Sequence, residues 1–238
     1  MENNSKILQI IERNIKILSD ILNKVIMDSI GLEEHVTVTN IVPHDFFSGE
    51  GGILKDFGSP TILFNDLKDS TKLLKELESE DILYYYSFYM HYSSKMLSEI
   101  LDEFNGKMVE CTGDGNYSIF DKENDKLLRE YAYFQELCYG ESQFNSYLDN
   151  FDEKEKEFIK TSPYMFDEKL RQLFFYIFSI FNIKVNYLLR GKIDKKFLTR
   201  VGCVTGKCQI MRIENSHIRQ DKLIGSVVHN SAHQASGK

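Results

Sequence analysis

The sequence predicts an α+β protein in which helices cover a β-sheet. Short apolar stretches bounded by Gly, Asn and Asp are typical of strands and hairpins, whereas longer stretches repeat apolar residues every three or four positions. The two patterns alternate in the order strand, helix, hairpin, helix, hairpin, helix. With 238 residues, 42% of them hydrophobic, the chain is long enough for one large domain with a substantial core.

Composition limits the kinds of function. A net charge of −7 argues against a broad nucleic-acid-binding surface, although a single pocket can still be locally positive. The four cysteines have no CxxC spacing, so we expect no structural disulfides and a cytoplasmic location. The most apolar run, residues 173–183, is shorter than the roughly 20 residues of a membrane span. We therefore expect a soluble protein that does not cross a membrane.

The first predicted element is an amphipathic helix over residues 5–30, within an N-terminal segment that we bound at 1–34. Its apolar positions alternate in spacings of three and four: Ile7, Leu8, Ile11, Ile15, Leu18, Leu22, Val25 and Ile26. This stripe either packs on the helix's own domain or pairs with a second copy in a coiled coil, and fewer than four heptads favour the first alternative. Residues 35–60 read as a loop with one strand at 35–42.

The middle of the chain contains the sharpest patterns. The stretch TILFND predicts a strand that ends in Asp66, and LKDSTKLL then leads into a helix over residues 80–104. A hairpin follows in KMVECTGDGNYSIF, with strands at 108–111 and 117–120 and turn residues between them.

Polar, locally helical residues 121–167 predict an insertion, and an apolar helix follows over 167–190. The stretches LTRVGCVTG and CQIMRI predict a second hairpin with a turn at Gly206-Lys207. The last segment, LIGSVVHNSAHQAS, reads as a loop leading into a helix.

Asp66 and Asp114 are candidate metal ligands. If the first strand pairs beside the hairpin, both carboxylates emerge at one edge of the sheet. Two such close carboxylates repel each other, and a divalent cation removes that cost. Mg²⁺ is typically held by one or two carboxylates together with substrate phosphates. From spacing alone, two unrelated turn aspartates remain an equal alternative.

Four segments carry a resemblance to a known family: ILFNDLKDST before a long helix, GKMVECTGDGNYSIF, TRVGCVTGKCQI and LIGSVVHNSAH. In this order they resemble the motifs of the class III nucleotidyl cyclase catalytic domain, which are Phe-x-Asp-Ile-x-Gly-Phe-Thr, Gly-Asp-Gly, Arg-x-Gly-x-x-x-Gly and Gly-Asp-x-Val-Asn-x-Ala-x-Arg. The matching segments span about 60–120 and 198–236. The short length and the N-terminal helix further resemble the stand-alone pyrimidine nucleotide cyclases of bacterial Pycsar anti-phage systems.

The resemblance implies a ferredoxin-like sheet and a catalytic domain over residues 35–238. It implies two Mg²⁺ or Mn²⁺ ions per active site, held by Asp66, Asp114 and the carbonyl of Leu67. The ribose 3′-hydroxyl would attack the α-phosphorus and release pyrophosphate, with Asp66 or a metal-bound water accepting the proton. The residues that would wrap the triphosphate at a helix N-terminus are Lys68, Asp69, Ser70 and Thr71.

Two positions would read the base. Glu110 and Lys222 match positions that hold a Lys–Asp pair in adenylate cyclases and a Glu–Cys pair in guanylate cyclases. A carboxylate accepts hydrogen bonds and an ammonium donates them, which suits the N–H and carbonyl of uracil or guanine and not adenine or cytosine. The resemblance to the Pycsar type favours UTP. The alternatives are an exposed strand position for Glu110 and a loop charge for Lys222.

The last motif departs from the family. His229 and His233 stand where the family has the Asn and Arg that contact ribose and phosphate, and Asn230 is one position away. In the family this helix completes the partner's active site, so the resemblance implies a homodimer with shared sites. It also implies a cyclic nucleotide product that acts on a separate effector in anti-phage defence. A cyclase-like regulatory domain without activity is the competing hypothesis.

Overall fold

The computed structural model describes residues 5–28, 54–80, 82–120, 124–214 and 219–237. The strand expected at 35–42 lies outside these residues. A four-stranded antiparallel sheet in the order β3-β4-β2-β5 forms the centre of the molecule. Its strands are β2 (Thr61–Leu67), β3 (Gly106–Thr112), β4 (Gly115–Phe120) and β5 (Thr199–Thr205). With helices between β2 and β3 and between β4 and β5, this is the ferredoxin-like topology. The predicted α+β fold is therefore confirmed.

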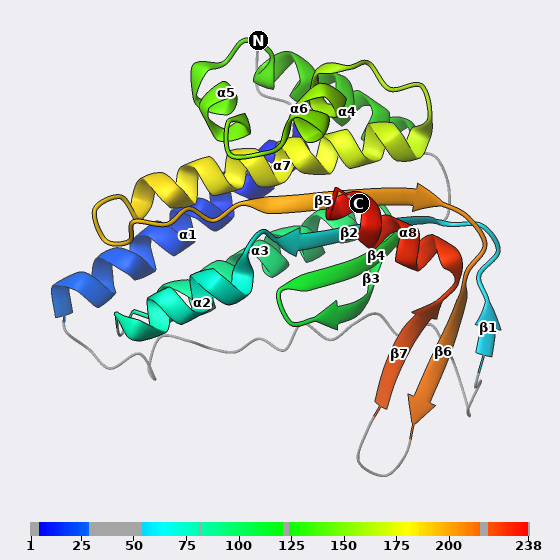
Figure 1. Cartoon of the computed structure of the whole chain (residues 1–238), viewed down its shortest axis with the longest axis horizontal. Coiled ribbons are helices and arrows are strands. Elements are labelled where there is room, and N and C mark those ends of the chain that lie inside the picture. Colours follow the sequence, from blue (N-terminus) through cyan, green and yellow to red (C-terminus); the bar gives the residue numbers. More distant parts are fainter. Residues whose placement is uncertain (1–4, 29–53, 81, 121–123, 215–218, 238) are drawn as a thin grey trace.

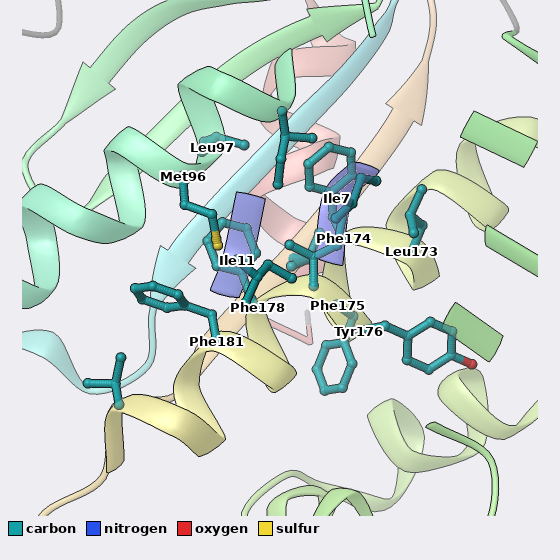
Figure 2. Close-up of a cluster of buried hydrophobic side chains, with 14 of the residues drawn as sticks. Ile7, Ile11, Met96, Leu97, Leu173, Phe174, Phe175, Tyr176, Phe178 and Phe181 are labelled. Carbon is teal, nitrogen blue, oxygen red and sulfur yellow. The ribbon is translucent and has the colours of Figure 1, made fainter. Parts of the chain in front are cut away.

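Two long helices, α3 (Tyr84–Glu103) and α7 (Phe166–Leu188), pack on one face of this sheet. The middle of α7, residues 173–183, is almost continuously apolar, which suits its burial between the sheet and other helices. Figure 2 shows the resulting core, in which Phe174, Phe178 and Phe181 of α7 lie among Met96 and Leu97 of α3. All five of these side chains are almost fully buried.

The N-terminal helix α1 (Lys6–Asp28) lies beside α3 and α7. Its apolar stripe, including Ile7 and Ile11, is buried in the same core (Figure 2). Of the two alternatives for this stripe, the structure shows packing within the chain. The helix N-terminus is fixed by Glu130, whose carboxylate accepts hydrogen bonds from the Ser5 hydroxyl and the Lys6 N–H.

The insertion predicted between the hairpin and the apolar helix consists of α4 (Asp125–Cys138), α5 (Ser142–Leu148) and α6 (Glu153–Lys160). Figure 1 shows these helices grouped over α7, on the side away from the sheet. A buried ion pair joins Arg171 of α7 to Glu155 of α6 at 2.6 Å. The insertion is therefore packed against α7 as part of the same domain.

A second sheet, in the order β1-β6-β7, contains β1 (Leu54–Asp56), β6 (Gln209–Glu214) and β7 (Arg219–Ile224). The predicted hairpin between residues 198–206 and 208–213 was wrong. β5 pairs with β2 in the first sheet, whereas β6 pairs with β1 and β7. The start of the final segment, predicted to be a loop, is the end of strand β7. The last helix, α8 (Ser226–Ala235), packs on β5 and β2.

Two further predictions needed correction. The segment after β2 forms a separate helix, α2 (Ser70–Ser79), before α3 begins. The hairpin turn contains Gly113 and Asp114 alone, because Thr112 already pairs with Gly115. A positive φ of 73° at Gly113 matches a type II′ turn, whose twist suits a tight hairpin.

No helix among the described residues is long and apolar enough to span a bilayer. All four cysteines are unpaired, as expected: Cys138, Cys203 and Cys208 are buried and Cys111 is exposed.

Candidate functional site

The candidate site is centred on the end of β2 and the tip of the β3–β4 hairpin. Asp66 is the last residue but one of β2, and Asp114 is the second residue of the two-residue turn. β2 and β4 pair up to Asn65 opposite Asn116, so the end of β2 lies beside the turn. The edge predicted to collect both carboxylates is therefore present in the structure.

The Asp66 and Asp114 carboxyl groups lie within hydrogen-bonding reach of each other. Burial, followed by the charge of Asp114, raises the pKa of Asp66. Arg200 of β5 opposes this shift, since its Nη2 lies 3.0 Å from Asp66 Oδ2. Arg200 and Asp66 are paired residues in the β5–β2 register, which explains the contact.

Two tyrosines border the carboxylates. Burial raises the pKa of Tyr86 on α3, and the charges of Asp114 and Asp66 raise it further. Tyr117 of β4 has a raised pKa from burial and from the charges of Glu110 and Asp66, and its ring packs 4.5 Å from that of Phe64. Both phenols therefore stay protonated near neutral pH.

A β-bulge places Glu110 on the side of the sheet away from α3 and α7. The β3–β4 register shifts between Met108 and Glu110, so that Met108 is opposite Ser118 but Glu110 is opposite Tyr117. Without the extra residue, Glu110 would share the face of Met108, which is in the main core. The bulge instead puts the Glu110 side chain on the face of Tyr117, toward β7.

Glu110 and Lys222 meet there, with 3.8 Å between Oε1 and Nζ. Lys222 lies in strand β7, so its interpretation as a loop charge was wrong. The Glu110 side chain is 13% exposed and that of Lys222 is 41% exposed, which leaves the ammonium accessible. The structure thus brings together the two residues predicted to read the base.

The turn between β2 and α2 contains the predicted triphosphate residues. Asp69 has φ 56° and ψ 29°, in the left-handed region, at the position where the resembled motif has Gly. Asp tolerates this conformation better than most residues, which explains how it can stand there. Ser70 begins α2, and the first N–H groups of a helix have no partner within it.

The Lys68 side chain contacts the end of the α5 segment in the insertion. Its ammonium donates to the carbonyl of Asn150 and lies 5.1 Å from the centre of the Phe151 ring. Its main-chain N–H donates to Leu198 at 2.8 Å. In this structure, therefore, Lys68 holds the turn in place.

The remaining predicted residues, His229, Asn230 and His233, are exposed on α8. The centres of the two imidazole rings lie 3.9 Å apart, and the ring planes are tilted by 50° to each other. Within the described part of one chain, no hydrogen bond or ion pair joins these three residues to Asp66 or Asp114.

The donor set at the aspartate pair suits a hard divalent cation. Among the described residues, no three His, Cys, Asp or Glu side chains gather in one place, so the pair offers two carboxylates without a third. That is the donor set by which Mg²⁺ is held when substrate phosphates supply further oxygens. A bound cation would offset the electrostatic repulsion between Asp66 and Asp114.

Sequence reasoning missed Arg200, Tyr86 and Tyr117 as members of this site. Arg200 lies in the quoted stretch TRVGCVTG, but only the strand register places it opposite Asp66. Tyr86 was one of many tyrosines in a helix, and nothing in the sequence distinguishes the one that borders the carboxylates.

No protein-family model matches this sequence, and no curated protein matches it. Several solved structures are similar to this chain in fold. The adenylyl cyclase CyaB from P. aeruginosa is 16% identical, with a TM-score of 0.47 over 77% of this chain and 74% of that one. A class III adenylyl cyclase-like ATP-binding protein from Pseudomonas aeruginosa is 15% identical, with a TM-score of 0.48 over 77% of this chain and 32% of that one.

The guanylyl cyclase Cya2 is 18% identical, with a TM-score of 0.44 over 79% of this chain and 72% of that one. These TM-scores lie below 0.5, so the function proposed below rests on the residues of the site.

Proposed function

We propose that this chain is a nucleotidyl cyclase that converts a nucleoside triphosphate, with UTP favoured, into the 3′,5′-cyclic monophosphate and pyrophosphate. The observation that carries the proposal is that two pairs of residues form around the β3–β4 hairpin. Asp66 and Asp114 lie within hydrogen-bonding reach of each other, and Glu110 and Lys222 lie 3.8 Å apart. The first pair fits a metal–phosphate centre and the second fits the edge of a base, which are the two ends of a nucleotide.

Asp66, Asp114 and the carbonyl of Leu67 would hold Mg²⁺ or Mn²⁺, two ions per site. When bound, the metal would lower the pKa of the ribose hydroxyl and neutralise charge on the leaving pyrophosphate. Burial and Asp114 raise the pKa of Asp66, which makes its carboxylate a stronger base. Asp66 is therefore our candidate to accept the proton of the 3′-hydroxyl.

The reaction is an in-line displacement. A bond forms between the 3′-oxygen and the α-phosphorus, the bond from that phosphorus to the pyrophosphate oxygen breaks, and the hydroxyl proton leaves to Asp66. Residues 68–71 and the N-terminus of α2 would hold the phosphates. Arg200 would join them, because its Nε is buried without a hydrogen-bond partner among the described residues and can donate to a phosphate oxygen.

The base preference follows from the chemistry of the second pair. The Glu110 carboxylate can accept from the N3–H of uracil while the Lys222 ammonium donates to O4. Guanine presents the same pattern through N1–H and O6, so GTP is the closest competitor. UTP is favoured because the chain as a whole resembles the stand-alone pyrimidine cyclases more than it resembles the guanylate cyclases.

His229, Asn230 and His233 would act in the site of a second copy. In one chain they have no described contact with the aspartates, and they are exposed on α8. A homodimer with shared active sites would bring them to the ribose and phosphates. There, a protonated imidazole would stabilise negative charge. We further propose that the cyclic product signals to a separate effector in anti-phage defence.

The decisive experiment incubates purified protein with Mn²⁺ and each of the four nucleoside triphosphates, and detects cyclic monophosphate and pyrophosphate. We expect cyclic UMP as the main product. We expect Asp66→Asn and Asp114→Asn to lower the rate by roughly 10²-fold or more, whereas Asp20→Asn, at an exposed position of α1, leaves it unchanged. Faster turnover of GTP would reassign the base. No product from any triphosphate would favour an inactive regulatory domain.

A further inference from the structure

A second candidate site lies away from the aspartates. An open cavity of about 1130 Å³ is lined by α5, the C-terminal part of α7 and the loop that joins α7 to β5. Ligand pockets commonly measure roughly 300–1,000 Å³, so this cavity is large enough for a nucleotide-sized molecule. None of Asp66, Asp114 or Glu110 lines it.

The lining of this cavity is basic, although the chain is acidic overall. Lys184, Arg190, Lys195 and Lys196 line it, and Asp194 is the one carboxylate among the lining residues. The net charge of the whole chain is −7. Cations gathered around a concave surface in an acidic protein raise the local concentration of small anions.

Most of these cations have no ion-pair partner among the described residues. Lys195 is paired with Glu76 of α2 at 3.7 Å. Within the described ranges, Lys184, Arg190 and Lys196 form no ion pair. Like charges that share a cavity repel one another, and a multivalent anion would offset this cost. A guanidinium beside two ammonium groups is well suited to phosphate oxygens.

The walls of the cavity are connected to the turn after β2. Asn150, which lines the cavity, accepts a hydrogen bond from the ammonium of Lys68. Leu198, two residues beyond Lys196, accepts from the main-chain N–H of Lys68 at 2.8 Å. The Lys195–Glu76 pair adds a contact to α2, the helix that begins at this turn. Both walls of the cavity therefore contact Lys68, at the start of the turn.

We propose that this cavity binds a small phosphate-bearing ligand and that binding orders the turn at residues 68–71. The cavity would then act as a regulatory site. The regulatory meaning rests on the proposed function, in which this turn holds the triphosphate of the substrate. Binding to the cavity itself does not depend on that function.

Calorimetric titration with inorganic tripolyphosphate in EDTA tests the binding. We expect Asp66→Asn to bind as wild type does, because the cavity is separate from the aspartates. The double variant Lys184→Glu/Lys196→Glu should bind at least roughly tenfold more weakly. Lys126→Glu/Lys160→Glu is the matched control, with the same charge change at exposed positions of α4 and α6. Arg190→Gln provides a milder second variant if the double variant does not fold.

Equal affinity in wild type and in folded cavity variants would overturn the proposal. Binding of a short RNA without binding of tripolyphosphate would also overturn it, because the site would then belong to a macromolecule.

Hydrogen exchange of residues 66–73 measures the coupling without any need for cyclase activity. Tripolyphosphate should slow this exchange in wild type and in Asp66→Asn, but not in the cavity variant. Unchanged exchange would refute the regulatory role. A protein that binds tripolyphosphate in the cavity yet forms no cyclic nucleotide would refute the proposed enzyme activity and leave the cavity assignment standing.

Discussion

Burial and a neighbouring carboxylate both favour the protonated form of Asp66. Both raise the pKa of Asp66, and the Arg200 guanidinium only partly opposes them. The folded protein therefore binds this proton more tightly than the unfolded chain does. Without metal, the contribution of Asp66 to stability is fully present below its unfolded pKa and is lost as pH rises through its higher folded pKa.

Thermal denaturation of wild type and Asp66→Asn in EDTA checks this sign. As pH rises from about 4, the Tm of wild type should fall relative to that of Asp66→Asn. The reason is that only wild type acquires an unfavourable negative charge at this position. Added Mn²⁺ should raise the Tm of wild type increasingly with pH, since protons and cations compete for the same carboxylate. An equal Mn²⁺ shift in both proteins would contradict the metal assignment.

Substitution of Glu110 tests whether this residue recognises the base. Glu110→Ala should lower kcat/KM for the preferred triphosphate by roughly ten- to hundredfold, because a base N–H loses a charged acceptor. Its neighbour Cys111 is exposed, so Cys111→Ser should have little effect. Steady-state rates with UTP and GTP would show the difference. Equal loss in both variants would mean that Glu110 has only a local structural role.

At the scale of elements, α8 lies against the sheet at a glycine. A Cβ atom on Gly202 of β5 would stand 1.8 Å from the carbonyl oxygen of Ser231 in α8. The first glycine of the Arg-x-Gly-x-x-x-Gly pattern is therefore needed for close packing of helix on strand. For Gly206, the second glycine, the nearest atoms are in the Val227 side chain, at 3.2 Å.

This contrast predicts that Gly202→Ala destabilises the protein by about 1–3 kcal/mol, whereas Gly206→Ala has a smaller effect. Because α8 carries His229 and His233, Gly202→Ala should also reduce cyclase activity more than Gly206→Ala does. Chemical denaturation and the rate assay measure the two effects. A larger effect from Gly206→Ala would show that α8 adapts to the added methyl group.

The elements themselves were largely predictable from periodicity. The amphipathic pattern predicted α1, the apolar run predicted α7 and the glycine turn predicted the β3–β4 hairpin. The β7 strand was missed, because its sequence, RQDKLI, shows no clear alternation of polar and apolar residues. The predicted partner of β6 was also wrong. The short sequence distance between β5 and β6 favours a hairpin, and only tertiary packing places the two strands in different sheets.

At the scale of the whole molecule, a buried ion pair connects the insertion to the sheet. Arg171 binds Glu155 of α6, the Val201 carbonyl of β5 and the Gln234 carbonyl of α8. Glu155→Ala should destabilise the fold by about 3–5 kcal/mol, because it leaves a buried guanidinium without its counter-charge. Lys156→Ala, which removes ion pairs with exposed carboxylates, should destabilise the fold far less than Glu155→Ala. Urea denaturation would distinguish the two.

Shared active sites predict complementation between two inactive proteins. Asp66→Asn subunits mixed with His229→Ala/His233→Ala subunits should recover activity, because each mixed dimer contains one intact site. Random exchange would give roughly a quarter of the wild-type rate. Each variant alone is the control. A mixture no more active than its components would place the histidines outside the partner's site.

The sequence by itself determined the class of fold and the residues that can do chemistry. Asp66 and Asp114 follow from short-range signals, a strand end and a glycine turn, which a sequence displays directly. Only the tertiary structure decided which groups meet. The contact of Asp66 with Arg200 depends on strand register, and that of Glu110 with Lys222 depends on a bulge and on a second sheet. These are long-range pairings, whose free energies depend on the packing of the whole chain and not on neighbouring residues.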